Sequence, residues 1–502
     1  GRAHSGGLNH FLSFFSFLIE EVARDPDGKC FKALSKAKYI AIEKPKSSVQ
    51  GDIRPIGITS VFRRIYGKYV MIDSGKLVGG VLSSRKRNPQ FAVGVSSGAN
   101  ILGLATNITR EIAPTHVSAA IDVTNAFNAL KRPPLFEALS KFRENFRCPK
   151  ELRRYDAFLS YARAHYAHGP QDLSFFMSDG ERKSVMCSRG VNQGCPHGTA
   201  LFSIALDFVV SAVFDEHGDS FPEVTSNWFA DDGVASGPLP EVKEFITILT
   251  RELQSKAGLE VKFVTCLGGF DTDAASLLEP VEGLNWKNIP WSPGDKECGI
   301  TVAGTPVGTA EYVRKEALAI VEKNQHRLDR IADFADHGED GPRDFGKDFT
   351  TVGTRHLALT LLDYCCKHRF DYVTHLISKE ILGDGLIEHV QRSIHSCFSR
   401  ICDGEIHVPL LDEVGKQLMA LPLRYGGQAI HDIGFEADIS LVSTLHALSP
   451  DIVRRIPELH RKKFYNAVET AGSGSSSDIF ADKNFSWLQA MVNACKRTNS
   501  LL

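Results

Sequence analysis

The sequence predicts an α/β (α+β) protein in which strands mixed with helices are followed by a mostly helical part. Across 116–310, short strands alternate with helices, and 117–123 alternates apolar and polar residues as a half-buried strand does. From 311 onward apolar residues recur at helical spacing, as in 310–334 and 356–382. No internal repeat with a period of about 20 to 50 residues is visible, which excludes repeat architectures.

Length and composition indicate a multidomain, soluble, intracellular protein. A chain of 502 residues exceeds the roughly 100–200 residues of one ordinary domain. Its hydrophobic fraction of 43% and charged fraction of 24% are those of a globular protein. The 11 cysteines include no Cys-x-x-Cys pair, which argues against a disulfide framework and a zinc ribbon and predicts a reducing compartment.

We expect no membrane-spanning segment. The longest amino-terminal apolar run, 11–19, is interrupted by Ser13 and Ser16 and is about half the roughly 20 residues that a membrane span requires. The chain begins with Gly1 instead of Met, so it looks like an excised piece of a longer protein.

The overall charge makes no case for nucleic-acid binding. The formal net charge is −2, from 58 Lys and Arg against 60 Asp and Glu. Binding would have to rest on local basic clusters, because phosphate contacts respond to local potential. Such clusters lie at 63–64, 85–87, 454–455 and 461–463.

The amino-terminal elements are short. A strand is expected at 39–42, leading into a polar turn at 44–48. After the strand at 117–123 the chain turns, and the two prolines at 133–134 fit the opening of the next helix, where proline is tolerated.

Two acidic features are candidates for chemistry. Asp122 lies on the polar face of the strand at 117–123, near its end, and 227–235 holds two short apolar runs separated by Asp231, Asp232 and a glycine. The second pattern predicts a hairpin with carboxylates at its bend. Hard oxygen ligands suit Mg²⁺, which takes one or two protein carboxylates and completes its shell with water and phosphates. The tripeptide alone is more often an ordinary turn, and it is the combination that favours a functional reading.

Between these carboxylates lies a glycine-rich segment, 188–198, followed by an apolar helical run at 199–214. Its glycines let the backbone approach a flat ligand, and the step from loop to helix offers N–H groups to an anion or a base pair.

In this order the segments resemble the reverse transcriptase domain of non-LTR retrotransposons, over about residues 38 to 445. Within the core, 121–128 resembles the first carboxylate motif of that family, 192–198 its template-grip motif and 229–232 its acidic hairpin. The flanking segments that resemble the family are 43–45, 54–56, 89–94, the primer-grip hairpin at 304–308 and the stretch 421–427.

The resemblance implies a right-hand polymerase fold with fingers, palm and thumb, followed by a helical carboxy-terminal extension. The expected divisions are fingers at 1–115, a palm with interleaved finger segments and the primer-grip hairpin at 116–310, a helical thumb at 311–410, and the extension at 411–502 with a flexible loop at 472–477.

The implied activity is RNA-directed DNA synthesis, in which dNTPs are added to a primer 3′-OH. Asp122 and Asp231 would hold two Mg²⁺ ions, for which Mn²⁺ could substitute, and Asp232 would be the supporting third carboxylate. The implied partners are an RNA template, a DNA primer or nicked target DNA, and dNTPs. No membrane and no obligate protein partner is expected, and the implied location is the nucleus.

Further residues acquire roles from the same resemblance. Phe127 would lie beneath the incoming sugar and select deoxynucleotides, although such a residue alone reads as a core aromatic. Arg54 and Lys44 would neutralise the triphosphate, although each alone reads as a solvated surface charge. Gln193 and Gly194 would touch the template or the nascent base pair, so that Gln193 would also help to bind the dNTP. Gly304 and Gly308 would contact the template or primer.

Some positions depart from the family pattern. Thr265 stands where a lysine commonly precedes a cysteine, with Lys262 nearby in sequence, and Cys195 and His197 replace more usual residues of the template grip. The sequence shows no endonuclease segment. A loose set of possible zinc ligands fits no familiar zinc knuckle: His395, Cys397, Cys402 and His407.

Two alternatives stay open. A group II intron-type maturase shares the fold and would combine reverse transcription with intron binding. A degenerate or domesticated copy would bind nucleic acid without polymerising.

Overall fold

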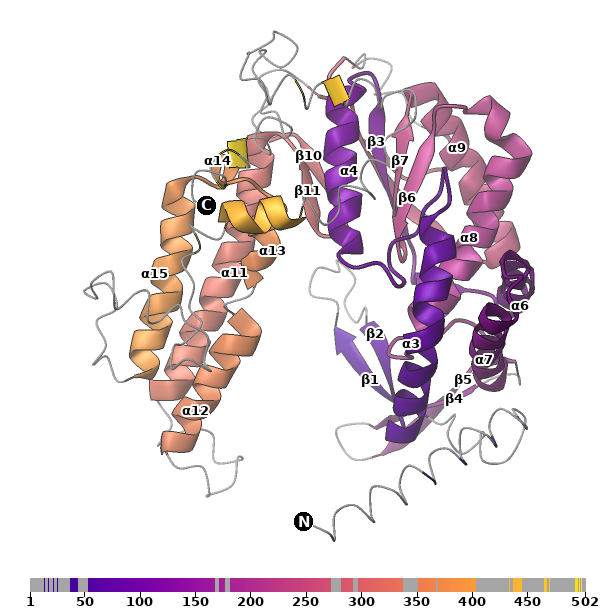
Figure 1. The fold of residues 1–502 in the computed structure, drawn as a ribbon, viewed down its shortest axis with the longest axis horizontal. Helices are drawn as coiled ribbons and strands as arrows, with labels where there is room; N and C mark the ends of the chain where they lie inside the picture. The colour runs from indigo at the N-terminus through magenta and orange to yellow at the C-terminus, as the bar shows by residue number, and fades with distance from the viewer. Residues whose placement is uncertain are drawn as a thin grey trace. The chain divides into compact units, whose positions relative to one another are not determined.

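The computed structural model falls into two compact units (Figure 1). The first comprises 1–102, 115–268 and 272–288, and the second comprises 103–114, 269–271 and 289–502. Within these units the structure describes residues 37–43, 53–167, 171–176, 181–271, 281–291, 297–336, 351–366, 369–402 and 437–444, together with single positions elsewhere.

A five-stranded sheet forms the centre of the first unit. Its strand order is β6-β7-β3-β8-β9. The strand β3 occupies the middle and pairs antiparallel with β7 and β8. The predicted strand at 117–123 is therefore confirmed. The bounds are β3 Val117–Val123, β6 Thr225–Phe229, β7 Asp232–Gly237, β8 Val261–Leu267 and β9 Trp286–Ile289.

A second sheet of four strands has the order β2-β1-β4-β5. Its middle strands β1 and β4 run parallel, whereas the outer pairs are antiparallel. The predicted strand at 39–42 is confirmed, since it lies inside β1. The bounds are β1 Ala37–Glu43, β2 Ile53–Thr59, β4 Gln171–Phe176 and β5 Arg182–Cys187.

Helices surround the central sheet of the first unit. The helix α6 begins with prolines in its first turn, as predicted, because a missing N–H costs nothing there. The helix α8 packs against α3, α6 and α9. The bounds are α3 Val61–Ser83, α5 Ala126–Ala129, α6 Arg132–Phe142, α7 Pro149–Tyr166, α8 Gly198–His217 and α9 Leu239–Glu252, with single turns at Arg143–Asn145, Gly218–Ser220 and Leu253–Ala257.

The stretch Gly198–Ser220 is long and apolar enough to cross a membrane, by length and composition only. Of its most apolar window, 72% is buried inside the protein. The helix is apolar because it is buried in the protein core.

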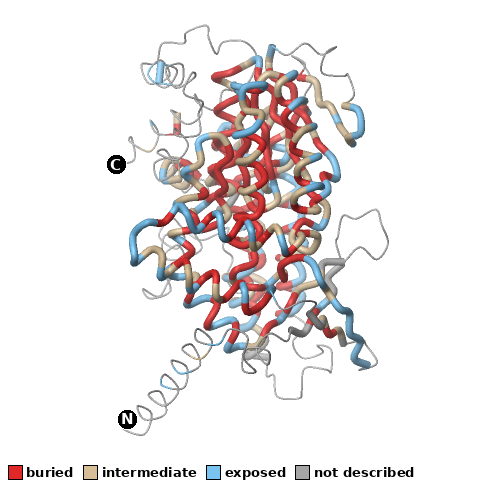
Figure 2. The backbone as a smooth tube through the Cα atoms, turned by 90° about the vertical axis from the view of Figure 1, so that its right-hand side faces the viewer, coloured by how far each residue is buried: buried red, intermediate tan, exposed pale blue. Residues whose placement is uncertain are grey.

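The core of the first unit is one apolar cluster that joins the central sheet to its helices. Figure 2 shows buried positions along the inner strands and helices, with exposed positions on the outer turns. Large aromatic side chains are fully buried in it, among them Trp228, Tyr155, Tyr161 and Phe202.

The second unit is mostly helical. Its α11 packs against α12, α14, α15 and the hairpin β10–β11. The helix predicted at 310–334 is confirmed, whereas the helical pattern at 356–382 is divided among several shorter helices. The helix α4 Gly98–Ile112 belongs to this unit from Gly103 onward. The other bounds are β10 Gly299–Val302, β11 Thr305–Gly308, α11 Ala310–Asp336, α12 Thr351–Leu361, the turn Leu362–Cys366, α13 Asp371–Thr374, α14 Lys379–Leu382 and α15 Asp384–Ile401.

The motif at 421–427 and the predicted loop at 472–477 lie outside the described residues.

Candidate active site

The central sheet brings Asp122 beside the acidic turn. In the antiparallel pairing of β3 with β7, Ile121 lies opposite Gly233, so Asp122 and Asp232 come next on the two neighbouring strands. The hairpin β6–β7 closes with Phe229 opposite Asp232, which leaves Asp231 in the connecting turn. The predicted hairpin with carboxylates at its bend is confirmed.

Packing across the hairpin explains why a glycine follows the two acids. A Cβ atom at Gly233 would overlap the indole ring of Trp228 across the hairpin. Trp228 is 1% exposed, and its indole N–H donates to the Ser226 hydroxyl at 3.1 Å. Ala230, before the acids, has a positive φ of 56°, a region that residues other than glycine seldom adopt. The turn thus holds a backbone geometry that the surrounding structure must enforce.

Strand alternation separates the residues of β8 by face. Phe263 lies opposite Asp122 and Thr265 opposite Ala120, and directly opposed residues share a face of the sheet. Thr265 therefore lies on the same face as Asp122. Lys262 is the extra residue of a β-bulge, because Phe263 pairs with Asp122 and Val261 pairs with the next residue of β3. Because Thr265 stands where the resembled family commonly has a lysine, the face of the sheet that carries Asp122 has no lysine at this position.

The glycine-rich loop is tied to the strands around it by main-chain hydrogen bonds. The amide of Val191 donates to the Phe127 carbonyl at 2.8 Å, and the amide of Gly57 in β2 donates to the Gln193 carbonyl at 2.7 Å. Gly194 has a φ of 98°, and a Cβ there would lie 2.6 Å from the Gly57 carbonyl oxygen. Gln193 is half-buried and Gly194 exposed, so the loop is fixed but its tip is accessible.

Arg132 holds the start of this loop, a role that the sequence does not indicate. Its guanidinium donates to the carbonyls of Gly190 at 3.1 Å and Arg189 at 3.2 Å. No local pattern distinguishes an anchoring arginine at a helix start from a solvated one. Only the tertiary structure reveals this role.

The unusual loop residues Cys195 and His197 both face the interior. His197 is fully buried and stacks on Tyr161, while the Cys195 sulfur lies 3.6 Å from the Tyr161 hydroxyl. Burial, and then the charge of Arg63, hold the pKa of His197 well below its ordinary value. Cys195 and His197, which replace more usual residues of the resembled family, therefore alter the packing behind the loop and leave its exposed tip unchanged.

Phe127 is half-buried and stacks on Phe202 of α8, with ring centroids 4.7 Å apart. Arg54 lies in β2 opposite Ile42, and its side chain lies outside the described part of the structure. Lys44 is also outside the described residues. Of the proposed nucleotide ligands, the structure thus describes Phe127 and Gln193, and the loop that carries Gln193 is bonded to the Phe127 carbonyl through the Val191 amide.

Gly304 and Gly308 lie in the second unit, in the hairpin β10–β11. Ala303 and Gly304 form its two-residue turn with φ values of 46° and 82°, a turn type that favours glycine. A Cβ at Gly308 would overlap the Cys298 carbonyl oxygen. The predicted primer-grip hairpin is a hairpin in the structure, and its role stays a prediction.

Among the described residues, no group of three or more His, Cys, Asp and Glu side chains is arranged to hold a metal ion. The described members of the possible zinc set, His395, Cys397 and Cys402, form no such group, and His407 lies outside the described residues. The carboxylates at the strand ends nevertheless fit Mg²⁺, because Mg²⁺ commonly takes one or two protein carboxylates and completes its shell with water and phosphates.

Residues 42–263 match the family model of reverse transcriptase (RNA-dependent DNA polymerase). The matched range runs from β1 into β8, so it contains Asp122, the acidic turn and the glycine-rich loop. This part of the chain therefore resembles a reverse transcriptase domain. Its mixture of strands and helices confirms the predicted α/β (α+β) class.

Solved polymerases also resemble the chain at low sequence identity. Telomerase from Candida albicans, in complex with a fragment of telomeric RNA, is 11% identical with a TM-score of 0.35, covering 82% of this chain and 62% of that one. Apo telomerase from Candida tropicalis, truncated from its carboxy-terminal domain, is 14% identical with a TM-score of 0.35, covering 48% and 51%. The sicinivirus 3Dpol RNA-dependent RNA polymerase is 12% identical with a TM-score of 0.40, covering 76% and 66%.

This chain thus spans between about half and two thirds of the length of those solved chains. No curated protein sequence matches it.

Proposed function

We propose that this chain is an RNA-directed DNA polymerase that extends a primer 3′-OH with dNTPs along an RNA template. The observation that carries the proposal is the antiparallel pairing of β3 with β7, which brings Asp122 beside the turn containing Asp231. It lies inside the range that matches reverse transcriptases.

The catalytic roles belong to the carboxylates. Asp122 and Asp231 would hold two Mg²⁺ ions, with Asp232 in support, and Mn²⁺ could substitute. When bound, such ions lower the pKa of the attacking hydroxyl and neutralise charge on the triphosphate. The protein itself supplies strand ends that fix the carboxylates relative to each other, so little reorganisation is needed during nucleotidyl transfer.

The loop and the aromatic residue beside it would select the nucleotide. The tip of the loop at Gly194 has no side chain, so a base pair can approach the backbone there, and Gln193 would contact that pair. Phe127 would lie beneath the sugar, where its ring excludes a 2′-OH. Its stacking on Phe202 supports this role, because a ring fixed by packing is a better steric barrier than a mobile one.

The order of the motifs supports a non-LTR retroelement as the source of this polymerase. Its primer would then be a nicked DNA end, and its place of action the nucleus. Arg54 and Lys44 would contact the triphosphate, and Gly304 and Gly308 the primer.

Primer extension tests the proposal. The purified chain would be assayed on poly(rA)/oligo(dT) and on a mixed-sequence RNA template with dNTPs and Mg²⁺, beside an Asp231→Ala, Asp232→Ala double variant. An Asp215→Ala, Glu216→Ala variant is the matched control, because it removes two adjacent exposed acids from α8.

Extension by the wild type and by the control, lost in the Asp231→Ala, Asp232→Ala variant with its thermal melting unchanged, would support the polymerase and its acidic site together. No extension with Mg²⁺ or Mn²⁺, with RNA binding retained, would overturn the proposal in favour of a degenerate copy that only binds nucleic acid.

A further inference from the structure

The acidic turn is held by a segment far away in the sequence. Residues 87–91 run alongside β6, where the Ser226 amide donates to the Arg87 carbonyl at 2.7 Å and the Trp228 amide to the Pro89 carbonyl at 2.9 Å. The amide of Phe91 donates back to the Trp228 carbonyl at 2.8 Å. The segment therefore ends beside the turn that carries Asp231.

At this end the side chain of Gln90 bonds to both main-chain groups of Ala230. Its amide nitrogen donates to the Ala230 carbonyl at 3.0 Å, and its amide oxygen accepts from the Ala230 N–H at 2.8 Å. That oxygen also accepts from the Ala92 N–H at 3.1 Å, which fixes the orientation of the amide. Gln90 is only 2% exposed, so water does not compete for these bonds.

The chemistry of the position calls for a primary amide. One group must donate to a carbonyl and accept from an N–H, and at neutral pH, where an exposed carboxyl group is ionised and only accepts, the flat side chain of Asn or Gln offers both. Ala230 is the residue with a φ of 56° directly before Asp231. Pinning both its N–H and its carbonyl fixes the direction in which the chain enters the carboxylate pair.

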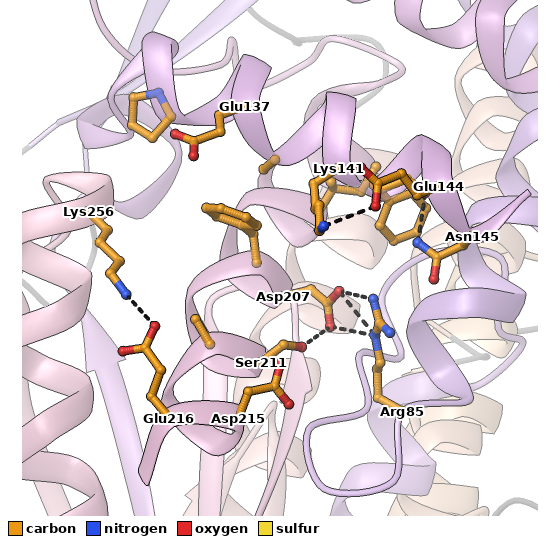
Figure 3. A pocket seen from close by; sticks show the side chains of 16 residues that line it. Arg85, Glu137, Lys141, Glu144, Asn145, Asp207, Ser211, Asp215, Glu216 and Lys256 are labelled. Carbon is orange, nitrogen blue, oxygen red and sulfur yellow. Dashed lines mark hydrogen bonds and ion pairs between the residues drawn. The ribbon is translucent and has the colours of Figure 1, made fainter. Parts of the chain in front are cut away.

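The start of the segment and the residues just before it are bonded to α8. These bonds keep the segment, and Gln90 with it, in place. The Arg85 guanidinium pairs with the Asp207 carboxylate at 2.8 Å, and the Asn88 amide donates to Asp207 at 3.1 Å and to Ser211 at 2.9 Å. Figure 3 shows Arg85, Asp207 and Ser211 together in a pocket of about 760 Å³. None of the three aspartates at the strand ends lines this pocket.

We infer that Gln90 is a positioning residue for nucleotidyl transfer, which acts through Ala230 to set the orientation of Asp231. This inference rests on the proposed polymerase function. It assigns no contact with substrate to Gln90 itself.

The first test compares Gln90→Met, which keeps the volume but loses both bonds to Ala230, with Asn88→Ala, which loses a buried amide of the same segment. Asn88→Ala keeps the bonds to Ala230, and the Arg85–Asp207 pair and the main-chain bonds to β6 still hold the segment in place. We expect Gln90→Met to lower kcat about 10- to 100-fold, as a displacement of roughly 1 Å in a reacting group does. The Mg²⁺ concentration for half-maximal activity should rise, and KM for the primer–template should be unchanged. Asn88→Ala should melt at a lower temperature than wild type with wild-type kcat and Mg²⁺ dependence.

A second variant, Gln90→Glu, gives a signature that packing alone would not produce. A protonated carboxyl group can donate to the Ala230 carbonyl as the amide does, whereas a carboxylate cannot. The ratio of Gln90→Glu to wild-type kcat should therefore rise as the pH falls, and this test still applies if Gln90→Met fails to fold.

A wild-type kcat and Mg²⁺ dependence in a folded Gln90→Met would overturn the inference while leaving the polymerase intact. A pH-independent ratio for Gln90→Glu would do the same. Failure of the wild type to extend any primer would instead overturn the proposed function, which separates the two conclusions.

Discussion

The imidazole of His197 stacks on the phenol ring of Tyr161, with ring centroids 3.7 Å apart and planes inclined by 13°. His165 meets the same phenol edge-on at 4.3 Å. Burial, and then the nearby charge of Arg63, lower the pKa of both histidines well below the ordinary value. Folding therefore keeps both imidazoles neutral behind the glycine-rich loop.

We expect the free energy of unfolding to decrease as the pH falls below about 6.5, the ordinary pKa of histidine. There the unfolded chain protonates His165 and His197 and the native state does not, so the unfolded state binds more protons and stability rises with pH. The slope should approach about 1.4 kcal/mol per pH unit for each histidine. Urea unfolding at a series of pH values between about 5 and 7 measures it.

The control is His197→Phe, which keeps an aromatic ring against Tyr161 but cannot be protonated. This variant should lower the slope of the unfolding free energy against pH by the contribution of one histidine. An unchanged slope would show that His197 is not the group that titrates.

The sequence predicted the features that are encoded locally. Asp122 on its strand and the acidic turn are visible because strand alternation and turn residues act over a few neighbouring positions. The inward orientation of His197 and the bonds of Gln90 to Ala230 were not predictable, because each depends on partners distant in sequence. The family pattern marked His197 as unusual, but only its stacking on Tyr161 of α7 explains where its side chain goes.

Gly233→Ala should damage both stability and activity. Its Cβ would overlap the Trp228 ring, and a small-to-large change in a packed site costs typically about 1–3 kcal/mol. The strain would fall on the hairpin next to Asp232, so kcat should also drop. Thermal melting and primer extension measure the two effects.

A Gly233→Ala, Trp228→Leu double variant tests the cause. A smaller residue at 228 makes room for the Cβ, so the added cost of Gly233→Ala should be smaller in that background than in the wild type. Equal costs in both backgrounds would mean that the Trp228 ring is not what restricts position 233.

Phe127→Val should relax the selection of sugars. If the ring excludes a 2′-OH, then the ratio of kcat/KM for a ribonucleotide to that for the matching deoxynucleotide should rise by about tenfold or more, which corresponds to roughly 1.4 kcal/mol. Single-nucleotide extension with each substrate measures this ratio. Phe202→Leu, which removes the stacking partner but keeps Phe127, should change the ratio less. Equal ratios in wild type and Phe127→Val would contradict a steric role.

Arg85→Met should destabilise the protein by about 2–3 kcal/mol at neutral pH. Removing one partner of a buried ion pair costs about 3–5 kcal/mol, and the value is smaller here because the Arg85 side chain is 31% exposed. Asp207 would remain as a buried carboxylate. Burial already raises its pKa, against hydrogen bonds from Arg85, Ser211 and Asn88 that lower it.

The free energy of unfolding of Arg85→Met should depend on pH in a direction that follows from the raised pKa of Asp207. A carboxyl group whose pKa is raised in the native state binds its proton more tightly there, so the free energy of unfolding falls as the pH rises from its ordinary pKa through the raised one. Losing Arg85 raises that pKa further and should steepen the fall. In an Arg85→Met, Asp207→Asn double variant, position 207 carries no titratable group, so much of the lost stability should return without this pH dependence. A double variant as unstable as Arg85→Met would show that the loss arises from the packing of Arg85 and not from the unpaired charge.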